Sequence, residues 1–184
     1  MDTNSIKKQK RHEKGNLENG DTDHCIDFDG GTHRHGNNQL HGTMRQIMLI
    51  IIHCSAVRPD QTSSAAQIDS WHRRQGWKLG IGYHYVVRRN GQIEPGRPEY
   101  MVGAHCKNHN QHSIGVCYEG GLDIRGQPAD TRTEAQKVAL RQLLEELHRR
   151  YPRALIVGHH DLNPHKACPC IADVAREYAE LQPQ

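Results

Sequence analysis

An unbroken aliphatic run, residues 47–52, lies about a quarter of the way along this chain of 184 residues. A strand with one face in water alternates apolar and polar residues, whereas an unbroken apolar run is typical of a strand buried on both faces. We therefore expect residues 48–53 to form the central strand of a sheet covered by other elements. The run is much shorter than the ~18 to 20 apolar residues that span a bilayer, so it predicts no membrane insertion.

The composition of the chain changes sharply near residue 45. Residues 1–44 contain one aromatic residue, Phe28, few aliphatic residues, and many Gly, Asn, Asp and Lys residues. Such a segment buries too little apolar surface to offset the entropy lost on ordering. We therefore expect a flexible, disordered polar tail over residues 1–44 and a globular domain over residues 45–184.

Charge and cysteine content argue against several classes of function. The net charge at pH 7 is +3, and the one basic cluster, within residues 7–14, lies in the tail, so no nucleic-acid partner is expected. The first residues lead into no apolar segment, which argues against a secretory signal peptide. In a chain without an export signal, the 6 cysteines are expected to be free thiols or metal ligands rather than disulfides.

The remaining hydrophobic pattern predicts a single α/β domain. The longest expected helix covers residues 132–150, with Thr131 and Glu134 as its capping box and an apolar face that includes Val138. A closing helix over 171–181 is expected to place Ala175 on its apolar side. The other expected elements are a helix over 64–75, strands over 83–88 and 92–94 joined by a turn at Asn90-Gly91, and strands over 113–118 and 154–158.

Residues that can bind a metal follow two of the expected strands. His53 ends the aliphatic run, the pair His159-His160 follows the strand over 154–158, and Cys168 comes eight or nine residues later. Imidazole and thiolate are preferred zinc donors, and catalytic zinc sites use three protein ligands with a fourth position open. Taken singly, a histidine at a strand end is more often an ordinary polar residue, and a lone cysteine a small buried hydrophobe. The spacing alone leaves open whether His53 meets the later donors.

Eight short segments carry a resemblance to a known family. Together they resemble the type 2 zinc-dependent N-acetylmuramoyl-L-alanine amidases, which are related to peptidoglycan recognition proteins, and most closely the small phage lysozyme-like amidases. The resemblance covers roughly residues 47–181, and the first 44 residues lie outside it. The segments are His53-Cys54-Ser55-Ala56, Gln75-Gly76-Trp77, Gly82-Tyr83-His84, Gly103-Ala104-His105, Ser113-Ile114-Gly115-Val116-Cys117, Gly120-Gly121, His159-His160 and Lys166-Ala167-Cys168-Pro169.

This resemblance implies a fold, a cofactor and a reaction. The fold would be a central mixed sheet flanked by helices, with a cleft that holds one Zn²⁺ per chain. The zinc ligands would be His53, His159 and Cys168, and the catalytic residues Tyr83 and Lys166. Zinc-activated water would hydrolyse the amide bond between N-acetylmuramic acid and L-alanine in bacterial peptidoglycan. General chemistry agrees, because zinc lowers the pKa of bound water from 15.7 to about 7 and an ammonium group can stabilise an oxyanion.

Two choices within the expected zinc site need an argument of their own. Neighbouring side chains on a strand point to opposite faces, so only one histidine of the pair should reach the metal, and we expect His159 rather than His160. The Lys-Ala-Cys-Pro motif favours Cys168 over Cys170, although Cys170 is an unusual thiol for this family that could compete as a ligand or oxidise with Cys168.

Further residues near the expected site receive no firm role. The alternation along the central strand turns Cys54 away from His53, so Cys54 is expected to be a packed free thiol. His165 is an extra residue in the loop before the Lys-Ala-Cys-Pro motif. His84 and His105 fall within matched segments and are left unassigned.

Two other functions compete with the zinc amidase. One is a peptidoglycan recognition module that binds muropeptide without cutting it, but binding-only relatives typically lack the cysteine ligand, whereas Cys168, Tyr83 and Lys166 are all present here. The other is a regulatory interaction protein, for which the tail offers no basis. We expect a monomer whose partner is peptidoglycan. It would be made in the cytoplasm and reach the cell wall through a holin or a secretion machine.

Overall fold

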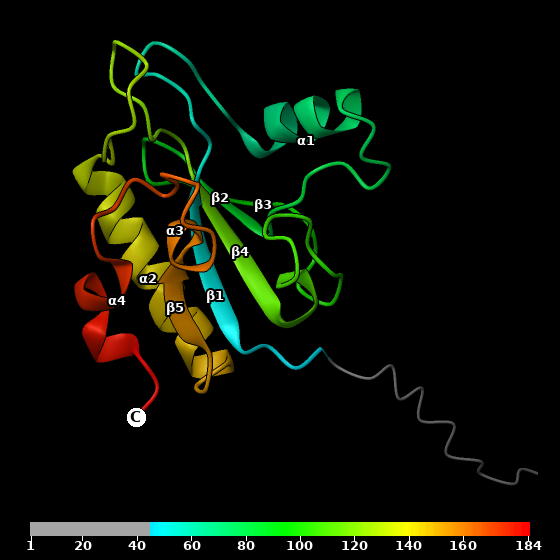
Figure 1. Ribbon diagram of the computed structural model, residues 1–184, viewed down its shortest axis with the longest axis vertical. Helices are drawn as coiled ribbons and strands as arrows, with labels where there is room; N and C mark the ends of the chain where they lie inside the picture. Colours follow the sequence, from blue (N-terminus) through cyan, green and yellow to red (C-terminus); the bar gives the residue numbers. More distant parts are fainter. Residues whose placement is uncertain (1–44) are drawn as a thin grey trace, which may run out of the picture. The chain divides into compact units, whose positions relative to one another are not determined.

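The computed structural model describes residues 45–184, so the flexible tail predicted for residues 1–44 lies outside the described residues. Within residues 45–184, five strands form one mixed sheet in the order β3-β2-β4-β1-β5 (Figure 1). The predicted α/β class is confirmed. The elements are β1 (Leu49–Cys54), α1 (Ala65–Arg74), β2 (Tyr85–Val87), β3 (Ile93–Pro95), β4 (Ser113–Tyr118), α2 (Glu134–Arg150), β5 (Leu155–Gly158), α3 (His159–Leu162) and α4 (Val174–Glu177), with short 3-10 turns at Asn110–His112 and Ala179–Leu181.

Strand β1 is an inner strand of the sheet, next to the middle strand β4, and it is buried on both faces as the aliphatic run predicts. It pairs in parallel with β4 on one side and with β5 on the other. Ile50, Ile51 and Ile52 have no exposed surface. Ile50 and Ile52 belong to the larger hydrophobic core, and the alternation of side chains along a strand turns Ile51 and His53 to the opposite face. Strand β1 therefore builds the core with one face and presents His53 on the other.

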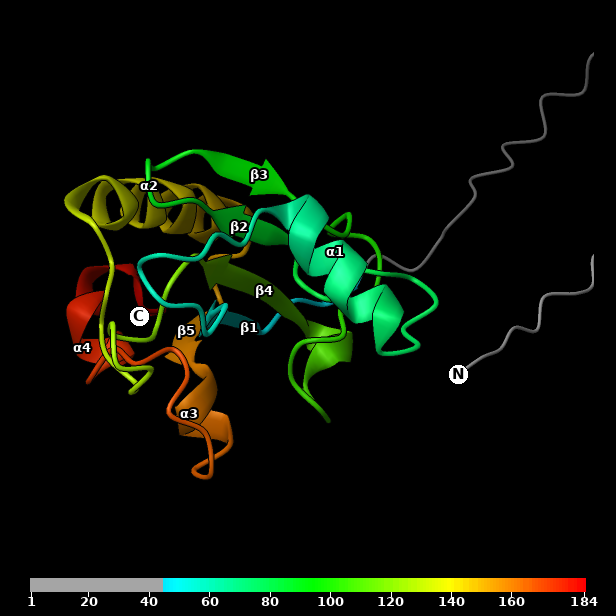
Figure 2. The same cartoon turned by 90° about the horizontal axis from the view of Figure 1, so that it is seen from above.

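Helices cover both faces of the sheet (Figure 2). On one face, α2 and α4 contribute Leu140, Leu144 and Val174 to the larger core. On the other face, Ile68 of α1 packs in a smaller cluster with Val86 of β2. No helix within residues 45–184 combines the length and the apolar character needed to cross a membrane.

The beginning of α2 differs from the sequence prediction. The capping box consists of Thr133 and Gln136, not Thr131 and Glu134. Thr131 is occupied elsewhere, because its Oγ1 accepts a hydrogen bond of 2.8 Å from the backbone N–H of Gly121. Val138 is 57% exposed, so the prediction that it lies on the apolar face of this helix was wrong.

The closing helix predicted over 171–181 is broken into α4 and a 3-10 turn. Ala175, predicted on its apolar side, is exposed. The tighter path still buries Val174, Tyr178 and Leu181 in the larger core. These three residues keep the spacing of one helix face, and their burial holds the C-terminal segment against the core although the helix is interrupted at Tyr178.

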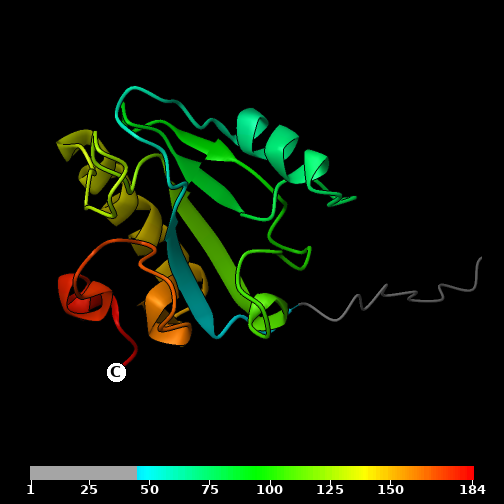
Figure 3. The ribbon, with the colours of Figure 1, turned by 45° about the horizontal axis from the view of Figure 1, so that its top comes forward.

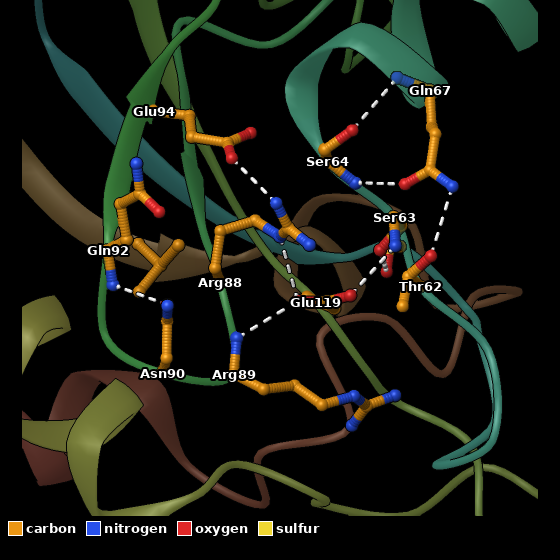
Figure 4. A network of polar contacts seen from close by, with 12 residues as sticks. Thr62, Ser63, Ser64, Gln67, Arg88, Arg89, Asn90, Gln92, Glu94 and Glu119 are labelled. Carbon is orange, nitrogen blue, oxygen red and sulfur yellow. Dashed lines mark hydrogen bonds and ion pairs between the residues drawn. The ribbon is translucent and has the colours of Figure 1, made fainter.

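A buried carboxylate joins three elements of the fold (Figure 4). Glu119, just after β4, is 2% exposed. Its Oε1 accepts a hydrogen bond of 2.8 Å from the N–H of Ser63, next to the start of α1. Its Oε2 accepts one of 2.9 Å from Nε of Arg88 and one of 3.0 Å from the N–H of Arg89, after β2. Burial raises the pKa of Glu119, but these hydrogen bonds outweigh it and hold the pKa below its ordinary value.

We expect Glu119→Gln to lower the free energy of unfolding by about 1.5 to 3 kcal/mol, the usual value of hydrogen bonds to a charged group. A carboxyl group with a lowered pKa stabilises the fold above its ordinary value of 4.5, and this contribution disappears as the pH falls through the lowered value. The difference between wild type and variant should therefore be largest at neutral pH and shrink in acid. Urea unfolding at several pH values measures it.

The matched control is Glu134→Gln, because Glu134 is 86% exposed in its ion pair with Lys137. That change should alter the free energy of unfolding by less than about 0.5 kcal/mol. Equal effects of the two variants, or a Glu119→Gln effect that does not change with pH, would contradict the stabilising role of Glu119.

Candidate metal centre and active site

Three side chains that were predicted as metal ligands come together at one place. One donor atom from each of His53, His159 and Cys168 lies within 4.8 Å of the others. Nδ1 of His53 is 3.7 Å from Sγ of Cys168, and the rings of His53 and His159 have centroids 4.6 Å apart. His53 is 1% exposed, while the other two are half-buried. The donor group is therefore buried on the side of His53, while His159 and Cys168 line a pocket.

The sheet and one short helix bring these residues together. Ile52 of β1 pairs with Gly158 of β5, and because the strands are parallel their carboxyl ends lie at the same edge. Helix α3 begins immediately after β5, as the orange part of the ribbon shows (Figure 3). The ring of His159, the first residue of α3, therefore lies beside that of His53. The loop that follows α3 returns to β1, where the backbone N–H of Cys54 lies 3.3 Å from Sγ of Cys168.

The histidine pair was predicted to lie at the end of a strand, but it begins a helix instead. Both residues lie in α3, which starts after Gly158, where the N–H of Gly158 donates to Oδ2 of Asp161 at 2.7 Å. Successive side chains of a helix diverge by about 100°, so the two rings still point in different directions. Nε2 of His160 lies 3.2 Å from a carboxylate oxygen of Asp161, outside the donor group. The choice of His159 matches the donor group, but strand alternation was the wrong reason for it.

Tyr83 and Lys166 line the same pocket as two of the donors. The pocket has a volume of about 320 Å³, and its walls include His159 and Cys168. Tyr83 is half-buried, and its ring centroid is 5.1 Å from that of His53. Lys166 is exposed at the pocket wall. The pocket thus combines a phenol, an ammonium group and potential metal ligands.

The surroundings keep the two imidazoles of the donor group neutral. Burial lowers the pKa of His53 well below its ordinary value, and the neighbouring His105 lowers it further. Burial also lowers the pKa of His159, with an added contribution from the positive charge of Lys166. A neutral imidazole offers a free lone pair, which is the form that binds a metal ion.

Cys170 contacts Cys54 rather than pairing with Cys168, the partner that the sequence suggested. Its Sγ lies 3.9 Å from Sγ of Cys54 and donates to the carbonyl oxygen of Gly121 at 3.2 Å. Cys54 is buried, as expected for a packed free thiol. A hydrogen bond with Cys168 and burial raise the pKa of Cys54 to about 12. Cys170 therefore lies next to the donor group but outside it.

The two histidines without an assigned role have different surroundings. His84 is 1% exposed and structural, because its Nδ1 accepts a hydrogen bond of 2.9 Å from the N–H of Gly115. Burial lowers its pKa to about 4. His105 lies 3.0 Å from His53, measured from Nδ1 to Nε2. The sequence did not predict this contact. The one sequence signal for His105 was its place in a segment that matches the family.

Comparisons with known proteins agree with this architecture. The endolysin of Klebsiella phage KP32 is 46% identical over 120 residues, which are 65% of this chain and 78% of the relative. The endolysin of Escherichia phage T7 is 45% identical over 120 residues, with the same coverage of both chains. The solved structure of the N-acetylmuramoyl-L-alanine amidase LysC from Clostridium intestinale URNW superposes with a TM-score of 0.63 at 28% identity, covering 76% of this chain and 87% of that one.

The family assignment follows from these findings. The sequence model of the family described as N-acetylmuramoyl-L-alanine amidase (Amidase_2) matches residues 43–171, which is more than half of the chain. The resemblance inferred from short motifs and the fold that it implied are therefore confirmed. This chain belongs to the N-acetylmuramoyl-L-alanine amidase family and is a hydrolase of bacterial cell-wall peptidoglycan.

Proposed function

We propose that this protein is a zinc-dependent endolysin that hydrolyses the amide bond between N-acetylmuramic acid and L-alanine, with His53, His159 and Cys168 as its zinc ligands. The observation that carries the proposal is the meeting of these three donors within 4.8 Å. Tyr83 and Lys166 line the adjoining pocket and are proposed as the catalytic residues. The relatives named endolysin support the same activity.

The donor set fits zinc. Two imidazoles and one thiolate are typical zinc donors, and three protein ligands are the usual number in a catalytic site. The lowered pKa values of His53 and His159 keep both rings in the form that coordinates a metal. When bound, zinc supplies Lewis acidity that activates water and polarises the scissile carbonyl. We propose one Zn²⁺ per chain.

Tyr83 would supply a hydroxyl donor to the reaction. Burial raises the pKa of Tyr83 well above its ordinary value, and the nearby thiol groups of Cys117 and Cys168 raise it further. The Oη atom of Tyr83 therefore keeps its proton at neutral pH. From the pocket wall this hydroxyl can hydrogen-bond the attacking water and orient it.

Lys166 would stabilise the negative charge that develops on the carbonyl oxygen. Its ammonium is near enough to lower the pKa of His159, which puts positive charge beside the donor group. A cation in this place binds the developing oxyanion more strongly than the neutral carbonyl of the substrate. That difference is what accelerates the reaction.

The substrate determines where such an enzyme acts. Peptidoglycan lies outside the cytoplasmic membrane, so the proposal includes synthesis in the cytoplasm and release through a holin or a secretion machine. We propose a monomer that binds muropeptide directly. The catalytic set of Tyr83, Lys166 and Cys168 favours cutting over binding alone.

The two neighbouring cysteines offer a matched test of the metal site. Wild type should hold about one zinc per chain, and Cys168→Ser should weaken zinc binding by more than about 100-fold, because losing a ligand costs more than losing a group that merely hydrogen-bonds one. Cys170→Ser should bind zinc like wild type, since Cys170 contacts Cys54 instead. Metal analysis after dialysis and competition with a chelator give the values.

A chelator should also abolish amidase activity, and added zinc should restore it. Equal zinc binding by Cys168→Ser and wild type would rule out Cys168 as a ligand. Loss of zinc in Cys170→Ser alone would reverse the assignment of the two thiols.

The catalytic roles are tested by removing one functional group at a time. Lys166→Gln should lower kcat by about 100- to 1,000-fold through loss of oxyanion stabilisation. Tyr83→Phe should lower it by about 100-fold or more through loss of the hydroxyl. Both variants should retain zinc. The measurement is the release of new L-alanine amino termini from purified peptidoglycan.

The control for these variants is Lys137→Gln, because Lys137 lies on α2 and pairs with Glu134, away from the pocket. Its kcat should equal that of wild type. A wild-type kcat in Lys166→Gln or Tyr83→Phe would remove that residue from the catalytic set without affecting the metal assignment.

A further inference from the structure

We propose that His105 is a positioning residue, which together with Ser113 holds His53 in the orientation and tautomer that a metal ligand needs. The inference rests on the proposed zinc site and extends it to two residues outside the donor group. It follows from a chain of hydrogen bonds that runs from His53 to the backbone.

The two ring nitrogens of His53 have different neighbours. Nδ1 is 3.7 Å from Sγ of Cys168, so this nitrogen faces the donor group. Nε2 is 3.0 Å from Nδ1 of His105, and the two rings are nearly perpendicular, at 83°. A nitrogen that binds a metal must offer its lone pair, so the proton of His53 belongs on Nε2.

That proton sets the direction of every later hydrogen bond. Nε2–H of His53 donates to Nδ1 of His105, which must then carry its own proton on Nε2. This second nitrogen lies 3.3 Å from Oγ of Ser113. Oγ of Ser113 in turn donates to the carbonyl oxygen of His109 at 2.7 Å. Each donor has an acceptor, and the chain is satisfied by one tautomer of each ring.

The surroundings hold the His105 ring in place. A Cβ atom at Gly115 would lie 2.6 Å from this ring, and one at Gly103 would lie 2.5 Å from it. The ring fits here because both residues are glycine. The backbone N–H of His105 donates to Oδ1 of Asn110 at 2.8 Å. The ring therefore lies against β4, where it can fix the ring of His53.

Removing the acceptor should weaken metal binding. His53 is 1% exposed, so without His105 its Nε2–H would find no water in exchange. The ring would be free to turn or to adopt the other tautomer, in which Nδ1 carries the proton and offers no lone pair. Loss of a residue that hydrogen-bonds a metal-binding histidine typically costs about 10- to 100-fold in metal affinity.

The test measures the zinc dissociation constant of the full chain by competition with a chromophoric chelator. His105→Leu should bind zinc about 10- to 100-fold more weakly than wild type. His105→Asn should recover most of the affinity, because its Oδ1 is as far along the side chain as Nδ1 of histidine and can accept the same hydrogen bond. His148→Leu is the control, since Nδ1 of His148 has no hydrogen-bond partner within residues 45–184, and it should bind zinc like wild type.

A second measurement reads the proton positions directly and does not depend on any variant folding. Long-range ¹H–¹⁵N NMR of the zinc-loaded wild type should show both His53 and His105 protonated at Nε2. A proton on Nδ1 of His105 would overturn the proposal, as would equal affinities for His105→Leu and wild type. A wild type that binds no zinc would overturn both this proposal and the zinc-dependent function, whereas failure of the His105 tests alone would leave the zinc site standing.

Discussion

The parallel pairing of β1 with β4 and β5 determines where the functional groups of this protein lie. A strand enclosed on both edges and both faces cannot shift its register, because a slip of one residue would exchange the core face for the pocket face. Ile50 and Ile52 hold one face in the core, so His53 must point the other way. The same pairing brings the end of β5, and with it His159, to the edge where His53 lies.

The sequence predicted the parts of the structure that depend on local pattern. An aliphatic run identified β1, alternation and turn residues identified β2, β3 and β4, and eight short segments identified the family. The start of α2 was missed because two threonines compete as the cap, and the contact of Thr131 with Gly121 decides between them. A similar local signal, Asp161 three residues after Gly158, could have revealed that the histidine pair begins a helix.

Contacts between a strand and a distant loop were beyond prediction from one sequence. Cys54 and Cys170 are 116 residues apart along the chain, and their sulfur atoms meet because the loop after α3 returns to the end of β1. The contact between His53 and His105 likewise joins β1 to a loop between two other strands. Neither contact leaves a periodic pattern in the sequence, since each depends on where the folded sheet places its connecting loops. The candidate ligands could thus be named from motifs, but not the residues that support them.

The two glycines beneath His105 have an evolutionary consequence. Gly115 is tied to the size of one neighbouring ring rather than to a turn, because a Cβ atom there would lie 2.6 Å from His105, whereas a Cβ atom at Gly103 would also lie 2.9 Å from His84. In homologues where a smaller residue replaces His105, selection against larger residues at position 115 should relax, while position 103 stays restricted by His84. Positions 105 and 115 should then covary, a pattern that an alignment of the family would reveal.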